Sequence, residues 1–96
     1  MDAVTTFEHD ETAHQYRLLD GTDVVSIADY RPLDDGTTLV FHHTLTPRAF
    51  RGNGYAAALI GQALHDVRAR DKKVVATCWF VEGYLVEHPE LADLRA

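Results

Sequence analysis

The chain has 96 residues, a formal net charge of −6 and one cysteine, Cys78. This length is enough for one modest hydrophobic core, so we expect a single domain over residues 1–96. The negative charge argues against a nucleic-acid partner, and one cysteine cannot form a disulfide within these residues. No apolar run is long enough to span a bilayer, so we expect a cytoplasmic protein with no membrane partner.

Three strand-like segments come first in the chain. Residues 14–19 alternate polar and apolar side chains, and residues 24–31 are rich in β-branched and aromatic side chains. The Asp20-Gly21 pair between them is typical of a tight hairpin turn. A third strand is expected over residues 37–46 and ends at Pro47, since proline cannot donate to a strand ladder. These segments predict an antiparallel meander.

A helix of about four turns is expected after the loop at residues 51–54. Apolar side chains recur there at helical spacing, at Ala56, Leu59, Ile60, Ala63, Leu64 and Val67. Residues 74–77 then predict a short buried strand, and residues 78–87 predict a second helix that ends before His88-Pro89. The order β-β-β-α-β-α indicates an α+β fold, with helices packed on a mostly antiparallel sheet.

The loop before the first helix has the chemistry of a phosphate-binding site. Gly52 and Gly54 lack Cβ atoms, so the backbone can turn tightly and a ligand can approach its N–H groups. These groups and the positive end of the helix dipole attract phosphate, and Arg51 adds a donor fork suited to phosphate oxygens. Residues 41–73 carry 6 basic and 2 acidic side chains, a net of +4, which favours an anionic ligand.

Two common phosphate-binding patterns do not fit this loop. A P-loop would end in glycine-lysine-serine or glycine-lysine-threonine, which is absent. Gly52, Gly54 and Ala57 have the G-x-G-x-x-A spacing of a dinucleotide fingerprint. However, residues 74–78 lack the carboxylate that this fingerprint requires about twenty positions later, and the chain is too short for a doubly wound sheet.

A third pattern matches, the acetyl-CoA loop of the GCN5-related N-acetyltransferase (GNAT) superfamily, written Gln/Arg-x-x-Gly-x-Gly/Ala. The matching residues are Arg51-Gly52-Asn53-Gly54-Tyr55-Ala56. The chain more narrowly resembles the short YjdJ-type, NATD1-like subfamily of this superfamily, over roughly residues 7–92. The residues that carry this narrower resemblance are His43-Thr44, Lys73-Val74, Cys78 and Tyr84-x-x-x-His88-Pro89-Glu90.

The resemblance implies a minimal GNAT-like fold and an N-acetyltransferase that uses acetyl-CoA as co-substrate. No metal is expected, because His42 and His43 have no third ligand placed near them. It implies that the main chain of Thr44, Leu45 and Thr46 pairs with the pantetheine arm of CoA like an extra strand. It also implies that the N–H groups of residues 51–56, which are Arg51, Gly52, Asn53, Gly54, Tyr55 and Ala56, hold the pyrophosphate.

Three side chains are candidates for the chemistry. Cys78 stands where a helix start would lower a thiol pKa, which allows a covalent acyl-cysteine step; the alternative is a small buried hydrophobe. By resemblance His43 could deprotonate the acceptor amine; the alternative is a ring that satisfies nearby backbone groups. By resemblance Tyr84 could protonate the departing thiolate; the alternative is an ordinary packed aromatic side chain.

Three functions remain open on the sequence. The first is acetyl transfer to an amine acceptor, such as a lysine side chain or a polyamine, which the acidic opening segment would attract. The second is a non-catalytic acyl-CoA-binding or sensing protein. The third is an interaction module that kept the fold without the ligand.

Overall fold

The computed structural model describes residues 4–96. Its five strands form one sheet in the order β1-β2-β3-β4-β5. The strands are β1 (Thr5–Asp10), β2 (Gln15–Asp20), β3 (Asp23–Pro32), β4 (Thr38–Leu45) and β5 (Lys73–Ala76). Neighbours from β1 to β4 pair antiparallel, and β4 and β5 pair parallel. The predicted α+β class with a mostly antiparallel sheet is confirmed.

Strand β1 is the one strand that the sequence did not predict. It pairs antiparallel with β2, from Thr5 opposite Asp20 to Asp10 opposite Gln15. Phe7 is the only apolar side chain in this strand, and His9 takes the next position on the same face. Alternation of apolar and polar side chains is the main signal of a half-buried strand. This segment is mostly polar and lacks that alternation, so the sequence does not predict a strand here.

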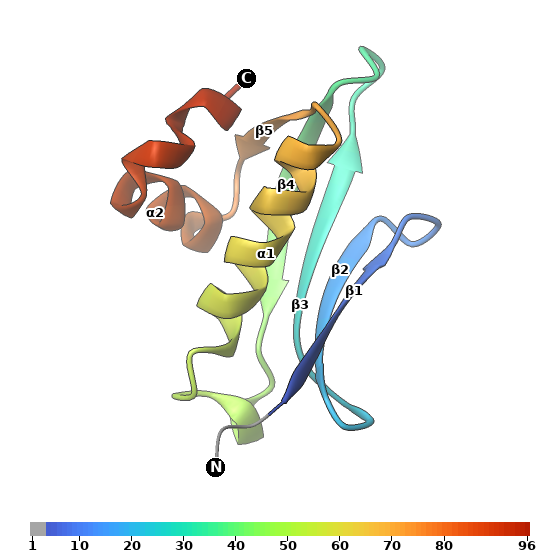
Figure 1. The fold of residues 1–96 in the computed structure, drawn as a ribbon, viewed down its shortest axis with the longest axis vertical. Coiled ribbons are helices and arrows are strands. Elements are labelled where there is room, and N and C mark those ends of the chain that lie inside the picture. Colours follow the sequence, from blue (N-terminus) through green and yellow to red (C-terminus); the bar gives the residue numbers. More distant parts are fainter. Residues whose placement is uncertain (1–3) are drawn as a thin grey trace.

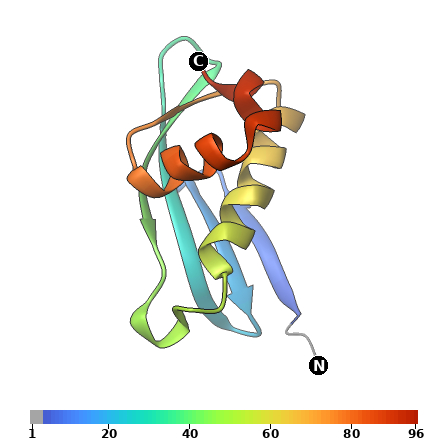
Figure 2. The same cartoon turned by 90° about the vertical axis from the view of Figure 1, so that its left-hand side faces the viewer.

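Both α-helices, α1 (Tyr55–Ala69) and α2 (Trp79–Glu87), lie on the same face of the sheet (Figures 1 and 2). Two 3-10 helices, η1 (Arg48–Phe50) and η2 (Pro89–Leu94), precede α1 and follow α2. No helix covers the other face of the sheet within the part of the chain that the structure describes. Neither α1 nor α2 has the length and apolar character that a membrane span requires.

The hydrophobic core lies between this sheet and the two helices. Five of the six side chains in the predicted stripe of α1 are buried, namely Leu59, Ile60, Ala63, Leu64 and Val67. The sixth, Ala56, lies in the first turn of α1 and is half-buried. The stripe packs against side chains of the sheet that are also fully buried, such as Tyr16 and Phe41. The helical periodicity therefore identified the core-facing side of α1 correctly.

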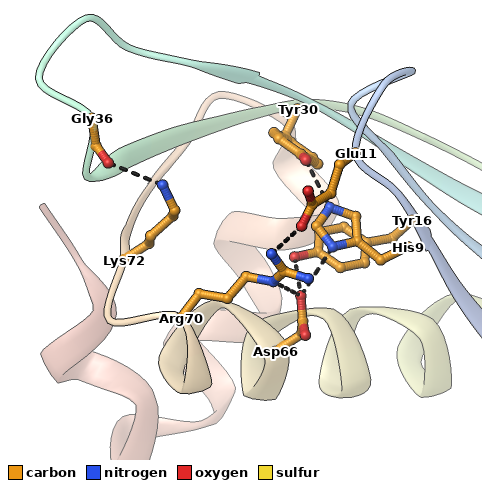
Figure 3. A network of polar contacts seen from close by, with 8 residues as sticks. All are labelled: His9, Glu11, Tyr16, Tyr30, Gly36, Asp66, Arg70 and Lys72. Carbon is orange, nitrogen blue, oxygen red and sulfur yellow. Dashed lines mark hydrogen bonds and ion pairs between the residues drawn. The ribbon is translucent and has the colours of Figure 1, made fainter.

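A network of polar contacts fixes the C-terminal end of α1 to the sheet (Figure 3). The Asp66 carboxylate accepts hydrogen bonds from the Tyr16 hydroxyl at 2.7 Å and from Arg70 Nε at 2.8 Å. The Arg70 guanidinium also pairs with Glu11 in the turn after β1. Burial, followed by the hydrogen bond to Asp66, raises the pKa of Tyr16 far above its usual value, so this hydroxyl remains a donor.

His9 lies beside this network and stacks on the ring of Tyr16 at a centroid distance of 4.0 Å. Its Nε2 atom is 2.7 Å from the Tyr30 hydroxyl, and its Nδ1 atom is 3.2 Å from Asp66 Oδ2. Burial lowers the pKa of His9, and the nearby Arg70 guanidinium lowers it further. The ring is therefore neutral near pH 7 and acts as part of the aromatic packing between β1, β2 and β3.

Candidate functional site

The candidate site begins where β4 separates from β5. The parallel pairing of these strands ends at Phe41 opposite Ala76. The backbone N–H groups of Thr77 and Cys78 both donate to the Phe41 carbonyl, at 3.0 and 3.2 Å, as the chain turns away into α2. Residues 42–45 of β4 therefore continue without a strand on that side, and their free backbone groups can pair with an extended ligand.

The glycine-rich loop lies beyond the end of β4 and leads into α1. Gly52 and Gly54 adopt φ values of 85° and 75°, a left-handed conformation that other residue types adopt only with strain. Of the N–H groups of residues 51–56 that were expected to hold the pyrophosphate, that of Arg51 instead donates to the Arg48 carbonyl at 3.3 Å. Within residues 4–96, the backbone N–H groups of residues 52–57 donate no hydrogen bond. These donors and the positive end of the α1 dipole suit the binding of an anion, as the glycine pattern predicts.

Side-chain contacts hold this loop in place. Arg51 Nε donates to the Thr46 carbonyl at 2.9 Å, which joins the loop to the end of β4. Asn53 Nδ2 donates to the Phe50 carbonyl at 3.0 Å, so the Asn53 side chain is used inside the loop. Because only Nε of Arg51 is engaged, its terminal guanidinium nitrogens make no hydrogen bond or ion pair within the described residues and remain available to an anion.

The free end of β4 and the loop form two walls of one pocket of about 570 Å³. This volume lies within the range of small-molecule and cofactor sites. The lining residues are Thr44, Leu45, Thr46, Phe50, Arg51, Gly52, Gly54, Tyr55, Ala56, Ala57, Trp79 and Phe80. Eight of these twelve belong to the nine residues predicted from the loop pattern and the strand before it; Asn53 is the ninth. The structure thus brings nearly all of the predicted cofactor-binding residues together.

Cys78 lies beside this pocket, buried at the start of α2. Its Sγ atom is 3.4 Å from the Thr44 hydroxyl. Burial alone would raise the pKa of the Cys78 thiol, but hydrogen bonds from Thr44 and from the backbone N–H groups of Val81 and Phe80 outweigh burial and lower it. The prediction that the helix start favours the thiolate agrees with this arrangement, whereas the catalytic role of Cys78 stays a prediction.

His43 is exposed and does not line the pocket. It pairs with Asp29 of β3, and the next residue, Thr44, points toward Cys78. Because neighbouring residues of a strand point to opposite faces, His43 lies on the face of the sheet that carries no helix. A register irregularity in β4 leaves its neighbour His42 without a partner on β3, so both histidines are exposed. The role of His43 stays a prediction.

Tyr84 also lies away from the pocket, on the next groove between α1 and α2. Its hydroxyl is so close to α1 that a Cβ atom added at Gly61 would lie 2.7 Å from it. Its ring stacks on His88 at a centroid distance of 3.9 Å. These contacts fit the packed-aromatic alternative, and the role of Tyr84 as a general acid stays a prediction.

Trp79 is a pocket residue that the sequence analysis did not single out. Its side chain is 83% exposed although it is a large apolar group. It lines the pocket together with Phe80. Only the placement of α2 against the end of β4 reveals this position, because nothing in the local sequence distinguishes an exposed aromatic residue from a buried one. Among residues 4–96, no group of three or more histidine, cysteine, aspartate or glutamate side chains could hold a metal ion.

Comparison with known proteins identifies similar chains. The family model for GCN5-related N-acetyl-transferases matches residues 4–94. Protein NATD1 from Xenopus tropicalis is 34% identical over 83 residues, which cover 85% of this chain and 75% of that protein. Human NATD1 is 34% identical over 84 residues, which cover 85% of this chain and 73% of that protein. The solution structure of a GCN5-like protein from Staphylococcus aureus superposes with a TM-score of 0.67 at 18% identity, covering 95% of this chain and 87% of that chain.

Proposed function

The chain belongs to the GCN5-related N-acetyltransferase family, in its NATD1-like branch, and from this membership we propose that it transfers an acetyl group from acetyl-CoA to an amine. The observation that carries the proposal is the pocket of about 570 Å³, in which the unpaired end of β4 adjoins the glycine-rich loop. An extended thioester arm and a pyrophosphate group need these two surfaces side by side.

The residues of the pocket fit CoA at both ends. The free N–H groups of residues 52–57 and the Arg51 guanidinium suit the pyrophosphate. Backbone groups of Thr44 and Leu45 suit the amides of the pantetheine arm, because they adjoin no strand on that side, whereas the Thr46 carbonyl already accepts from Arg51 Nε. In this reaction the thioester C–S bond and one amine N–H bond break, an amide bond forms, and the CoA thiolate takes up a proton.

The acceptor is proposed to be a cationic amine, such as a lysine side chain or a polyamine. Residues 1–40 carry 2 basic and 9 acidic side chains, and Glu8, Asp10 and Asp29 lie on strands β1 and β3 of the sheet. By strand alternation these carboxylates share the helix-free face with His43. We therefore propose that the amine approaches from this face, where His43 could accept its proton directly or through water.

Binding is tested by the thermal stabilisation that CoA produces. A ligand that binds only the folded state raises the midpoint of unfolding. Arg51→Glu places a negative charge beside the proposed pyrophosphate site, so it should abolish the CoA-induced shift. Arg31→Glu, which makes the same change at an exposed position at the far end of β3, should leave the shift intact. The absence of any shift in the wild-type chain would favour an interaction module without a ligand.

Turnover separates an enzyme from a CoA-binding protein. The pocket wall carries no histidine, aspartate or glutamate, and this observation favours a non-catalytic acyl-CoA-binding or sensing protein as the second candidate. Release of CoA thiol should be measured with lysine peptides, polyamines and amino acids as acceptors. Acceptor-dependent release supports the transferase, and its absence across this panel, with CoA binding intact, supports the binding protein.

The role of Cys78 is tested in the same assay. If its thiol accepts the acetyl group, Cys78→Ala should lower kcat at least about a hundredfold. CoA binding should persist, because Cys78 does not line the pocket. Full turnover by Cys78→Ala would show that acetyl passes directly to the amine and that the thiol is structural.

A further inference from the structure

Within residues 4–96, Ser26 of β3 and Thr38 of β4 are the two buried serine or threonine residues, at 0% and 6% exposure. Burial of a hydroxyl group is unfavourable unless it makes a hydrogen bond, so its partners show what it holds in place. The Thr38 hydroxyl donates to Asp35, three positions earlier in the same turn. The partners of Ser26 are 19 and 20 positions away, at the end of another strand.

The Ser26 hydroxyl contacts the chain where it leaves β4. The backbone pairing of β3 and β4 ends with Ile27 opposite Leu45. Ser26 Oγ lies 3.0 Å from Thr46 Oγ1 and 3.4 Å from the Leu45 carbonyl oxygen. With the Thr46 hydroxyl as donor to Ser26, the Ser26 hydroxyl can donate to Leu45, so both bonds form together. This contact extends the connection between the two strands by one residue, into the segment that leads to the glycine-rich loop.

Thr46 in turn holds the side chain of Arg51. The Thr46 carbonyl accepts a hydrogen bond from Arg51 Nε at 2.9 Å. The guanidinium group is planar and rigid, so a bond to Nε fixes the direction in which its two terminal nitrogens point. A displacement of Thr46 therefore changes where Arg51 can meet an anion, and Ser26 is the side chain that fixes Thr46 from the core.

We propose that Ser26 is a positioning residue of the CoA site, which holds Thr46 and, through the Thr46 carbonyl, directs the Arg51 guanidinium toward the pyrophosphate. Thr46 and Arg51 line the pocket and Ser26 does not, so Ser26 acts without touching the ligand. The inference rests on the proposed function, because it takes CoA as the ligand of this pocket.

The test is calorimetric titration of the full chain with CoA. Ser26→Ala removes the hydroxyl without adding volume, so CoA binding should weaken about fivefold, the effect typical of one hydrogen bond. Thr46→Val removes the partner hydroxyl while nearly keeping the shape of the side chain, and it should have a similar effect. Thr46→Ser keeps a hydroxyl at this position and should retain the wild-type affinity.

Combined variants show whether the three residues act in series. If Ser26 acts through Thr46, the double variant of Ser26→Ala and Thr46→Val should bind CoA no more weakly than either single variant. In an Arg51→Ala background, Ser26→Ala should leave the remaining CoA affinity unchanged. Additive losses in either combination would overturn the proposal, because Ser26 would then affect binding independently of Thr46 or Arg51.

Thr38→Val is the matched control, because it removes a buried hydroxyl at the opposite end of β4 from the loop. The variant loses the hydrogen bond to Asp35, so its free energy of unfolding in urea should fall. Its affinity for CoA should equal that of the wild type. Loss of a buried hydroxyl would then lower CoA affinity only where that hydroxyl holds the loop.

The outcomes distinguish this inference from the proposed function. If the wild-type chain does not bind CoA, both fail. If it binds CoA and Ser26→Ala binds equally well, or Thr38→Val weakens binding as much, CoA binding stands and Ser26 has only a structural role. Should Ser26→Ala fail to fold, the comparison of Thr46→Val with Thr46→Ser decides. A loss of affinity in Thr46→Val alone supports the proposal, and equal affinities overturn it.

Discussion

The Sγ atom of Cys78 lies 3.4 Å from the hydroxyl of Thr44 and so connects the start of α2 to the unpaired end of β4. These two residues are 34 positions apart in the chain. The contact spans the place where β4 and β5 separate, which is also where the pocket opens. The Thr44 hydroxyl can donate to the Cys78 thiolate, and mutation of Thr44 removes this contact.

Thr44→Val should raise the pKa of Cys78. Burial raises this pKa, and the Thr44 hydroxyl is the largest of the contributions that lower it, so its removal leaves burial less opposed. The measurement is the rate of iodoacetamide alkylation against pH, which reports one thiol because Cys78 is the only cysteine. The thiolate should appear at higher pH in Thr44→Val than in the wild type.

Thr22→Val is the control for this change, because Thr22 is exposed in the turn between β2 and β3. It should leave the alkylation profile unchanged. An identical profile for Thr44→Val and wild type would show that the Thr44 hydroxyl does not stabilise the thiolate.

Gly54→Ala should destabilise the fold by about 1–2 kcal/mol, the cost of a left-handed conformation for a residue with a Cβ atom. Gly54 has φ of 75°, and a Cβ atom there would meet nothing within 4 Å, so the cost is strain and not a clash. Relaxation of this strain should displace the N–H groups of the loop and weaken CoA binding. Urea unfolding and calorimetry measure the two effects.

Gly83→Ala provides the comparison for stability. Gly83 lies inside α2, has no positive φ and also faces open space, so alanine should keep or increase stability there. Equal stability of the Gly54→Ala and Gly83→Ala variants would show that the loop tolerates alanine without strain.

Local patterns were enough to predict the loop and α1. The requirement for Gly52 and Gly54 follows from turn chemistry, and the buried stripe of α1 follows from a period that is visible in the sequence. Strand β1 was missed because a core-facing position is filled by His9, whose burial depends on Tyr16 and Asp66 from other elements. Such contacts join distant parts of the chain, so the spacing of apolar residues within one segment cannot predict them.

In the candidate site, too, some features could be predicted from local sequence and others could not. Its loop and strand residues share a continuous stretch of sequence, so their proximity could be predicted. The exposure of Trp79 and the distance of Tyr84 from the pocket depend on how α2 sits against α1 and β4. The angle between packed elements is set by side chains of both partners, which no single segment specifies.

Asp66→Ala should destabilise the fold by about 1–3 kcal/mol, because it leaves the buried Tyr16 hydroxyl without its acceptor. Tyr16→Phe should cost less, since Asp66 keeps its hydrogen bond from Arg70 and the phenylalanine ring has no hydroxyl to leave unpaired. In the double variant the costs should be less than additive. Urea unfolding of the four proteins measures the coupling, and additive costs would contradict a direct Tyr16–Asp66 interaction.

Gly61→Ala tests the packing of α2 on α1. Alanine is favoured over glycine inside a helix by about 1 kcal/mol, so this change would ordinarily stabilise α1. At Gly61, however, the new Cβ atom would lie 2.7 Å from the Tyr84 hydroxyl, and its next neighbour is Tyr84 Cζ at 3.7 Å. The Tyr84 ring is stacked on His88 and cannot move without disturbing that contact.

Removal of the hydroxyl separates the two effects. In the wild-type background Gly61→Ala should raise the free energy of unfolding little or not at all, since the displacement of Tyr84 offsets the gain in helix propensity. In the Tyr84→Phe background the nearest remaining atom is at ordinary contact distance, so Gly61→Ala should stabilise by about 1 kcal/mol. Unfolding free energies of the four proteins measure this difference. An equal effect of Gly61→Ala in both backgrounds would mean that the Tyr84 hydroxyl does not rest on Gly61 in solution.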